Sequence, residues 1–377
     1  MTEAHVNKKR NRKKICFFSG DITRSGGTER VACLIANGLA ERQEFQIFVL
    51  SLVEKNKTMF FSLKKQISHQ ALGRRWLRPG PGYLALVPRL RNYLKENEID
   101  VIVDIDIVLD VLSIPAAYGR KTKVVSWEHF SFGFETAVRF SYRNIILRYV
   151  TTKADAIVTL TDKDRQAFID RMRALPPVFA IYNPVEPVAA EKKQEKTRKK
   201  QWIITTGRLV YEKGPDYLLR TAEIVLKKYP DWQWIVLGDG DKREWLQDQI
   251  QKRHLERQLL LKGTVREVDV YLSQAQIFVL TSRREGLPMC LLEAKAHGLA
   301  LVSFDIETGP DELITNNSNG FLIPAYDCER MAEKIGQLLE HPHVRYAFME
   351  HAQDGMEKFQ PEAVLYRWNE VLLTVCG

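Results

Sequence analysis

Short, wholly apolar segments alternate with helical patterns along this chain, and the alternation occurs twice. Strands that are apolar on both faces belong to a parallel sheet covered by helices on both sides. The sequence therefore predicts an α/β fold with two doubly wound, Rossmann-like domains. The expected strands are 15–18, 45–52, 101–107, 124–127 and 156–160, then 202–206, 234–237, 259–261, 277–280 and 301–304; the expected helices are 29–43, 90–96 and 145–152, then 214–228, 242–251 and 291–297.

The two rounds are separated where the alternation stops, at residues 183–187, and a charged run follows at Glu191–Lys200. This break predicts an N-terminal domain over 1–184, a charged linker over 185–200 and a C-terminal domain over 201–357. The run is interpreted as a solvated linker, with a nucleic-acid or lipid contact as the alternative. Two such domains are expected to bind ligands in a cleft onto which the carboxyl ends of both sheets open.

Composition indicates the cellular compartment and the type of partner. The five cysteines are scattered and form no C-x-x-C pair, which argues against disulfides and a zinc site and fits a reducing cytoplasm. No apolar stretch is long enough to cross a membrane, and no secretion signal is visible. The net charge of +9 suits an anionic partner, whether nucleic acid, a phosphorylated small molecule or a membrane surface.

Two segments of the second domain carry the strongest candidate site. Arg208 and Lys213 lie in a loop between a strand and a helix, where both cations can converge on one diphosphate. Glu285 begins a second loop, Glu293 follows on a helix that Pro288 can start, and the amides of Gly286, Leu287, Pro288 and Met289 lie between them. Two ordinary surface cations and a chance pair of glutamates are the alternatives.

The first domain offers weaker candidates. Gly26 and Gly27 precede a helix N-terminus, where free amides favour an anion, although an ordinary glycine turn explains them equally well. His129 follows a strand and is expected to point into the cleft, unless it is simply packed. Asp106 is a candidate for facing the acceptor. The D-x-D segments at 104–106 and 239–241 are not expected to bind metal, because they lie in or directly after strands.

Taken together, these segments resemble the family 4 glycosyltransferases. The residues that carry the resemblance are Gly26-Gly27, His129, the G-R-L-x-x-x-K-G segment with Arg208 and Lys213, and the E-x7-E pair Glu285/Glu293. The resemblance implies a GT-B fold with an acceptor domain, a donor domain and a helix at about 358–377 that crosses back to the first domain. The narrower likeness is to bacterial enzymes of lipopolysaccharide, O-antigen and capsule assembly.

The resemblance also implies roles. Arg208 and Lys213 would neutralise the donor diphosphate and Glu293 would hold the ribose. Glu285 and the amides of residues 286–289 would position the sugar, Gly26-Gly27 would close over its phosphate side, and His129 would contact it near the reacting carbon. The expected reaction is retaining, metal-independent transfer of a hexose or N-acetylhexosamine (galactose, glucose, GlcNAc or GalNAc) from a nucleotide sugar, most commonly UDP-linked, with no cofactor. Catalysis would rest on positioning and leaving-group stabilisation.

The acceptor implied is a glycan or lipid-linked saccharide at the inner face of the cell membrane. Two basic and aromatic stretches fit a peripheral contact there: residues 74–78 with Tyr83, Arg89 and Arg91, and residues 135–149. Solvated basic faces are the alternative. The competing classes are a nucleotide-sugar epimerase or another GT-B-like enzyme, and a basic nucleic-acid-binding protein. The last would need aromatic residues within the charged run, which has none.

Overall fold

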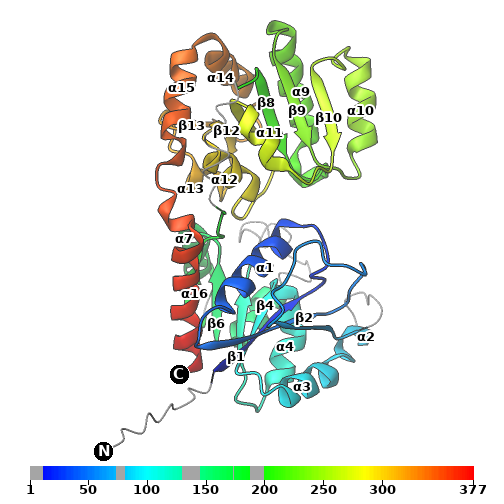
Figure 1. The fold of residues 1–377 in the computed structure, drawn as a ribbon, viewed down its shortest axis with the longest axis vertical. Coiled ribbons are helices and arrows are strands. Elements are labelled where there is room, and N and C mark those ends of the chain that lie inside the picture. The colour runs from blue at the N-terminus through cyan, green and yellow to red at the C-terminus, as the bar shows by residue number, and fades with distance from the viewer. Residues whose placement is uncertain (1–11, 74–80, 130–144, 173, 187–198) are drawn as a thin grey trace, which may run out of the picture. The chain divides into compact units, whose positions relative to one another are not determined.

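The computed structural model describes residues 12–73, 81–129, 145–172, 174–186 and 199–377. Contacts divide the chain into two units. Unit 1 comprises residues 1–184 and 361–377, and unit 2 comprises residues 185–360. Each is built on one parallel sheet with helices packed against it (Figure 1). The predicted α/β class, with two doubly wound sheets, is confirmed.

Unit 1 has a seven-stranded sheet in the order β3-β2-β1-β4-β5-β6-β7. Every pairing in it is parallel. Its strands are β1 (Lys13–Ser19), β2 (Phe45–Ser51), β3 (Ser68–Ala71), β4 (Val101–Ile105), β5 (Lys123–Trp127), β6 (Ala156–Thr159) and β7 (Val178–Ala180). Its helices are α1 (Gly27–Leu39), α2 (Pro81–Leu84), α3 (Val87–Glu96), α4 (Asp110–Ala117), α7 (Asp162–Arg171) and α16 (Pro361–Cys376).

Unit 2 has a six-stranded parallel sheet in the order β10-β9-β8-β11-β12-β13. Its strands are β8 (Trp202–Thr206), β9 (Gln233–Leu237), β10 (Leu259–Gly263), β11 (Ile277–Leu280), β12 (Ala300–Asp305) and β13 (Gly320–Pro324). Its helices are α9 (Pro215–Lys228), α10 (Arg243–Lys252), α11 (Val268–Gln274), α12 (Met289–Ala296), α13 (Pro310–Leu313), α14 (Cys328–Glu340) and α15 (Pro342–Glu350). The apolar strands and the inner faces of α9 and α14 form its core.

The final helix, α16, belongs to unit 1 although it follows all of unit 2 in sequence. It lies beside α1, where a Cβ on Gly38 would come 2.4 Å from the Leu365 side chain. Its Trp368 is fully buried and packs edge-on against Trp127 at the end of β5, with ring centroids 4.8 Å apart. Unit 1 therefore needs a helix from the far end of the chain to complete its aromatic core.

Two expectations about local structure were wrong. The strand expected over 101–107 ends at Ile105, because Asp106 has a φ of 100° and begins a 3-10 turn over Ile107–Leu109. The helix expected over 145–152 is a π turn (Ile146–Val150) followed by a 3-10 turn (Thr151–Lys153).

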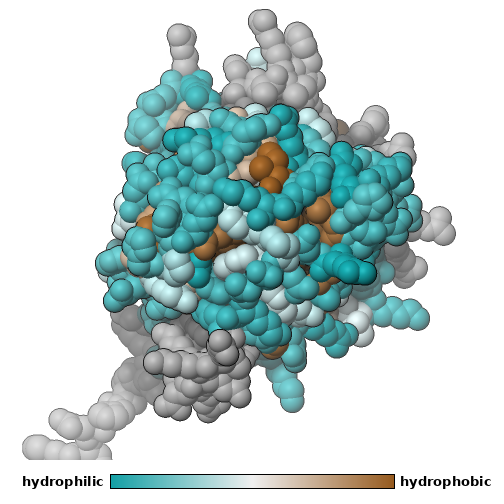
Figure 2. Space-filling view, turned by 90° about the horizontal axis from the view of Figure 1, so that it is seen from above, coloured by the Kyte–Doolittle hydropathy of each residue, from teal (hydrophilic) through white to brown (hydrophobic). Residues whose placement is uncertain are grey.

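The face shown in Figure 2 is largely hydrophilic, with only small, separate hydrophobic spots. Among the described residues, no helix is both long enough and apolar enough to cross a bilayer.

A pair of carboxyl groups is buried in unit 1, between β4 and α4. Asp104 accepts a hydrogen bond from Ser113, and Asp110 accepts bonds from Ser126 (2.8 Å) and Thr151 (2.6 Å). Both carboxyl groups are fully inaccessible to solvent. Burial raises the pKa of Asp104 well above its usual range, and burial likewise raises the pKa of Asp110 to about 6. The folded protein therefore holds protons here that the unfolded chain releases near pH 4.

This pair predicts a pH-dependent loss of stability. The folded state binds more protons than the unfolded state above pH 4, so the free energy of unfolding falls as pH rises through the raised pKa values. Asp104→Asn cannot ionise but can still accept from Ser113. Between pH 4.5 and 7.5 the variant should lose roughly 1 to 3 kcal/mol less stability than the wild type. Calorimetric melting across this range tests it against Asp170→Asn, an exposed carboxylate on α7; equal pH slopes for Asp104→Asn and wild type would contradict the prediction.

Candidate functional site

The order of strands in unit 2 places its candidate site. β8, the first strand of the sheet, lies between β9 and β11, so the connections run in opposite directions from the β8–β11 boundary. In open α/β sheets, ligands bind at the carboxyl ends of the strands at such a reversal. The loop carrying Arg208 and Lys213 leaves β8 there, and the loop carrying Glu285 leaves β11. Two segments separated by about seventy residues in sequence thus meet at one edge of the sheet.

Lys213 and Glu285 form the centre of this site. The Lys213 Nζ donates to both carboxylate oxygens of Glu285, at 2.6 and 2.8 Å, and Ser282 Oγ donates to Glu285 Oε1 at 2.6 Å. The Glu285 side chain is only 8% exposed. Burial by itself would lower the pKa of Lys213, but the Glu285 carboxylate outweighs it and the pKa lies above its ordinary value. Lys213 is therefore an ammonium ion at neutral pH, and one of its three N–H groups donates to no residue that the structure describes.

Arg208 supplies a second positive charge. Its side chain is exposed, and its charge acts on Lys213 by lowering the pKa of the ammonium, so the two cations share one region of space. Its loop is held by the segment after β9, because Leu209 N–H donates to Asp239 O and Lys242 N–H donates to Leu209 O, both at 2.9 Å. The D-x-D segment at 239–241 therefore supports the turn that presents Arg208.

The loop after β11 adds backbone donors. It leads into α12, whose first turn faces this edge with the N–H groups of Met289 and Cys290 not yet used in the helix. In the part of the chain that the structure describes, these two groups and the N–H of Gly286 donate to no other protein group. Of the four residues expected to donate through amides, Pro288 has no N–H, and the side chain of Leu287 is buried in the core. Glu293 lies one turn further along α12 and is half-buried.

The loop after β12, which contains Thr308 and Gly309, contacts the loop that carries Glu285. Thr308 Oγ1 donates to the carbonyl of Glu285 at 2.8 Å. Gly309 has a φ of 102°, and a Cβ there would lie 2.4 Å from the Gly286 carbonyl oxygen. Only glycine allows this close approach. The position of Glu285 therefore depends on the Thr308–Gly309 turn.

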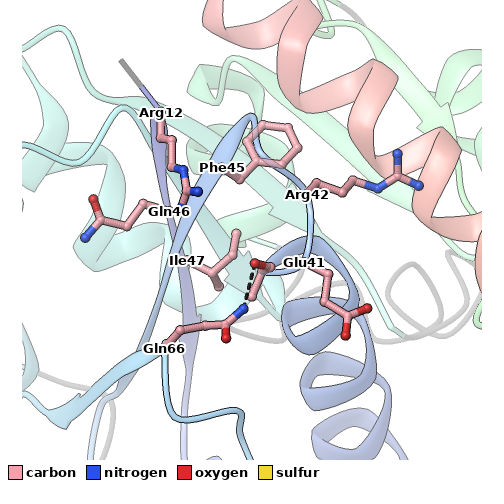
Figure 3. Close-up of a pocket in the computed structure, with 8 residues that line it drawn as sticks. Arg12, Glu41, Arg42, Phe45, Gln46, Ile47 and Gln66 are labelled. Atoms are coloured by element: carbon pink, nitrogen blue, oxygen red, sulfur yellow. Dashed lines mark hydrogen bonds between the residues drawn. The ribbon is translucent and has the colours of Figure 1, made fainter. Parts of the chain in front are cut away.

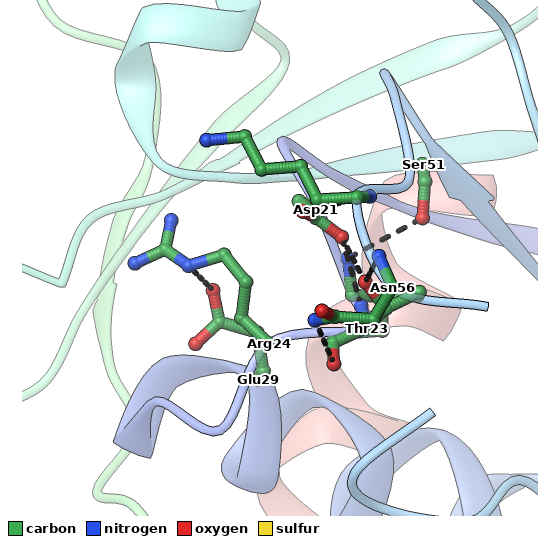
Figure 4. Close-up of polar contacts among 8 residues, drawn as sticks. Asp21, Thr23, Arg24, Glu29, Ser51 and Asn56 are labelled. Carbon is green, nitrogen blue, oxygen red and sulfur yellow. Dashed lines mark hydrogen bonds and ion pairs between the residues drawn. The ribbon is translucent and has the colours of Figure 1, made fainter. Parts of the chain in front are cut away.

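Unit 1 repeats the arrangement, with β1 between β2 and β4. Gly26 and Gly27 lie after β1 and begin α1, as predicted. The Glu29 carboxylate lies directly over Gly26, since a Cβ on Gly26 would be 2.2 Å from Glu29 Oε2. Arg24 Nε lies 3.5 Å from Glu29 Oε1 (Figure 4). The N-terminal end of α1, where the sequence predicts an anion, thus has a carboxylate of the protein over it, which the sequence did not reveal.

The preceding loop is tied down by side chains. Asp21 Oδ1 accepts from the backbone N–H of Thr23 at 3.1 Å, and Asn56 Nδ2 donates to Thr23 O at 3.1 Å (Figure 4). These contacts fix the backbone that leads into Gly26.

His129 follows β5 at the carboxyl edge of unit 1. It is 9% exposed, and its ring lies 4.3 Å from the Trp127 ring. Its Nε2 has no hydrogen-bond partner among the described residues, and residues 130–144 lie outside them. Burial lowers the pKa of His129 to about 3, so the imidazole is neutral across the physiological range. Asp106 follows β4, where its carboxylate accepts from Val108 N–H at 3.1 Å.

Neither a metal-ligand cluster nor the pocket in unit 1 offers a better candidate site than the carboxyl edge of the unit 2 sheet. No group of three potential metal ligands occurs among the described residues. A pocket of about 390 Å³ in unit 1 is lined by residues that include Arg12, Arg42 and Gln66 (Figure 3). These residues precede β1, β2 and β3, so the pocket lies at the amino ends of the strands, opposite the edge where ligands bind.

The prediction that Tyr83 belongs to a basic and aromatic membrane contact, with residues 74–78, Arg89 and Arg91, was wrong. Tyr83 is 4% exposed and packs in the core of unit 1, so it cannot lie at an interface. Arg91 Nη1 donates to the carbonyls of Ala116 (3.0 Å) and Tyr118 (2.7 Å), which caps α4. Arg89 is exposed. Residues 74–78, and residues 135–144 of the second stretch, lie outside the described residues.

Comparison with known proteins identifies the family. Residues 25–188 match the model of glycosyltransferase family 4, and residues 188–354 match that of glycosyl transferases group 1. The chain belongs to the family 4 glycosyltransferases and has their GT-B fold.

Three relatives match along nearly their whole length. An uncharacterized glycosyltransferase of Haemophilus influenzae is 29% identical over 96% of this chain and 100% of its own. The amylovoran biosynthesis glycosyltransferase AmsD of Erwinia amylovora is 25% identical over 95% and 99%. An N-acetyl-D-galactosaminyltransferase of Campylobacter jejuni, named for an undecaprenol-linked saccharide, is 23% identical over 96% and 99%.

A solved structure shares the fold. Alr3699/HepE of Anabaena, crystallised with UDP, is 21% identical and superposes with a TM-score of 0.75 over 96% of this chain and 100% of its own. At this identity the likeness concerns the fold.

The supporting turn predicts an effect of Gly309→Ala. The new methyl group would collide with the Gly286 carbonyl and adopt a left-handed backbone conformation, which costs about 1–2 kcal/mol before any clash. We expect the loop of Glu285 to shift and nucleotide binding, measured by calorimetry, to weaken at least tenfold. Gly355→Ala is the matched control, since Gly355 has a φ of 73° but no atom within 4 Å of a new Cβ. Equal affinities in both variants would refute a role for the turn.

The environment of His129 predicts its titration. Followed by NMR, the His129 imidazole resonances should not shift between pH 5 and 8, because its pKa is about 3 in the folded protein. In the denatured chain the same group should titrate near 6.5. A folded-state midpoint above pH 5 would mean that His129 is solvated or ion-paired.

Proposed function

We propose that this glycosyltransferase transfers a hexose or N-acetylhexosamine from a nucleotide sugar, with UDP as the nucleotide, and retains the anomeric configuration without a metal ion. The observation that carries the proposal is the partly buried Lys213–Glu285 pair, beside the exposed Arg208, at the strand reversal of unit 2. Two cations and free backbone N–H groups at one edge form a site for a diphosphate. The UDP bound by Anabaena Alr3699/HepE supports this nucleotide.

In this proposal Lys213 serves two acceptors at once. Two of its N–H groups keep Glu285 in place, and the third binds a phosphate oxygen of the donor. Arg208 binds the diphosphate through its planar fork. As the bond between the sugar carbon and the phosphate oxygen breaks, negative charge grows on the departing diphosphate, and these two cations stabilise it. Lys213 needs no change of protonation state for this role, because its raised pKa keeps the side chain positively charged.

The remaining roles follow the chemistry of each group. Glu285 is held by Lys213 and Ser282, so its carboxylate can accept hydrogen bonds from sugar hydroxyls without moving. The amides of Gly286, Leu287 and Met289 position the same sugar, and Glu293 accepts from the ribose diol. For unit 1 we propose that Gly26-Gly27 contacts the phosphate side, which requires the Glu29 carboxylate to leave its place over Gly26 when the donor binds. His129, as a neutral imidazole, contacts the sugar.

The retaining reaction needs no protein nucleophile. The acceptor hydroxyl forms its bond to the anomeric carbon on the face from which the nucleoside diphosphate departs. The departing phosphate oxygen takes the hydroxyl proton. The residues of this chain contribute by holding the donor and neutralising the leaving group.

We propose a glycan or lipid-linked saccharide as acceptor, in the assembly of a bacterial surface polysaccharide or lipopolysaccharide. The relatives from Erwinia and Campylobacter support this class by their names, amylovoran biosynthesis and an undecaprenol-linked saccharide. The net charge of +9 fits a cytoplasmic enzyme that meets an anionic membrane surface from the inner side.

The test is donor binding and turnover. UDP-, GDP- and ADP-sugars are screened by thermal shift and donor hydrolysis, with and without EDTA. One nucleotide should stabilise the protein, and turnover should survive EDTA. Lys213→Ala should reduce kcat by about 10²- to 10³-fold, the usual loss when a group stabilising developing charge is removed, and Glu285→Ala should also impair turnover.

Lys227→Ala is the control, since Lys227 is an exposed lysine of α9 that pairs with Glu223 within its own helix. A requirement for a divalent metal, or full activity in Lys213→Ala, would overturn the proposed role of the cations.

A further inference from the structure

Arg283 joins the two loops of the donor site, although no motif marked it. It lies in the loop after β11, two residues before Glu285. Its backbone N–H donates to Glu212 O at 2.8 Å, and its Nη1 donates to Tyr211 O at 2.7 Å. Both acceptors belong to the turn Tyr211–Lys213, which follows β8. The loop after β11 is therefore fastened to the turn that ends in Lys213.

The guanidinium also binds the start of the next helix. Its fork faces the Asp216 carboxylate, with Nη1 to Oδ1 at 2.8 Å and a second bond from Nη2 to Oδ2. Asp216 is in the first turn of α9. Arg283 thus contacts the chain on both sides of Lys213, at Tyr211 and at Asp216. A planar fork can satisfy such a carboxylate and a carbonyl together, whereas a lysine ammonium cannot match that geometry.

Aromatic rings enclose the guanidinium. Its central carbon lies 4.0 Å from the centroid of the Tyr211 ring and 4.2 Å from that of Tyr217. Tyr217 in turn stacks on Tyr326, with centroids 5.2 Å apart and planes 14° apart. The Arg283 side chain is only 12% exposed, so these contacts are partly shielded from water. Desolvated cation–π contacts of this kind hold a side chain more firmly than an exposed ion pair does.

A neighbouring contact completes the connection. Thr281 Oγ1 donates to Lys213 O at 3.2 Å. The next residue, Gly214, has a φ of 64° and lies so close to the Thr281 carbonyl oxygen that a Cβ would collide with it. Lys213 therefore has its own backbone held by Thr281, its preceding turn held by Arg283, and its side chain held by Glu285. In this set Arg283 makes the largest number of independent connections between the two loops.

We propose that Arg283 is a positioning residue of the donor site, which holds Lys213 opposite Glu285 by fastening the loop after β8 to the loop after β11. The inference rests on the proposed function for its catalytic consequence, but the geometry it describes exists without a ligand. Arg283 itself contacts neither reacting atom in this proposal. It acts through the placement of Lys213.

The first experiment needs no nucleotide. Arg283→Lys keeps the charge but loses the fork and the stacking, so the Lys213–Glu285 pair should loosen and the pKa of Lys213 should fall. Amine labelling of Lys213 between pH 8 and 9, followed by mass spectrometry, should then be severalfold faster than in the wild type. Lys252, paired with Asp248 within α10, is the internal reference and should label equally in both proteins.

The second experiment measures function. In Arg283→Lys the Kd for UDP should rise about tenfold, and kcat for transfer should fall between about ten- and a hundredfold. A loss of this size is expected when a group that stabilises the transition state is displaced by up to about 1 Å. The KM for the acceptor should stay unchanged. Arg220→Lys is the matched control, because Arg220 is an exposed arginine of α9 paired with Glu329. Asp216→Asn, which weakens only the fork contact, should give the same changes to a smaller extent and serves if Arg283→Lys does not fold.

The outcomes separate the two hypotheses. Unchanged labelling of Lys213 in Arg283→Lys and Asp216→Asn, even with a lower melting temperature, overturns the proposal and leaves Arg283 a structural residue. Faster labelling together with weaker UDP binding supports it. Faster labelling in a protein whose wild type binds no nucleotide sugar supports the positioning of Lys213 and refutes the proposed function instead.

Discussion

The reversal of strand order at the first strand of each sheet is the constraint on which the candidate site depends. In unit 2 the connections from β8 and from β11 diverge, which leaves the carboxyl ends of these neighbouring strands uncovered by a crossing helix. Arg208, Lys213 and Glu285 all lie on the two loops that begin there. In unit 1 the same reversal at β1 and β4 places Gly26 and Asp106 at the corresponding edge. The sheet decides where the loops meet, and the loop residues decide what they bind.

Once the loops meet, a few close contacts fix their side chains. The Lys213–Glu285 pair costs desolvation of two charges, which is recovered only because both carboxylate oxygens are hydrogen-bonded and Ser282 adds a further donor. Glycines at 214 and 309 allow backbone approaches that any side chain would prevent. Rigidity of this kind favours electrostatic catalysis, because charges that are already in place need no reorganisation when the leaving group departs.

Much of the fold could be predicted because the central strands are continuous apolar runs. β8 and β11 fall where the pattern placed them, and a loop of glycine and charge after a strand pointed to Arg208, Lys213 and Glu285. The edge strand β3 (Ser68–Ala71) is short and largely exposed, so it has no apolar signal. α4 contains Pro115 in its interior, a residue that ordinarily disfavours a helix, so its sequence gave no helical signal. The buried carboxyl group of Asp110 at the start of α4 is stabilised by hydrogen bonds from Ser126 and Thr151, which the sequence does not show.

The contacts between distant loops could not be predicted. Lys213 and Glu285 are 72 residues apart, and Arg283 and Asp216 are 67 apart, so their pairing depends on the relative placement of two strands. The burial of His129 likewise depends on the Trp127–Trp368 packing, whose second ring comes from α16. A motif identifies residue types suited to a chemistry, but the partners that set their charge and orientation come from the tertiary fold.

The placement of α16 has a consequence for how the protein is made. Because this helix packs in unit 1 but follows every described element of unit 2 in the sequence, all of unit 2 is synthesised before unit 1 can acquire Trp368. Until then the indole of Trp127 and the surface of α1 near Gly38 are left without their covering helix. Unit 1 therefore lacks part of its apolar core while unit 2 is being synthesised, and it can be completed only after the last residue of unit 2 has been made.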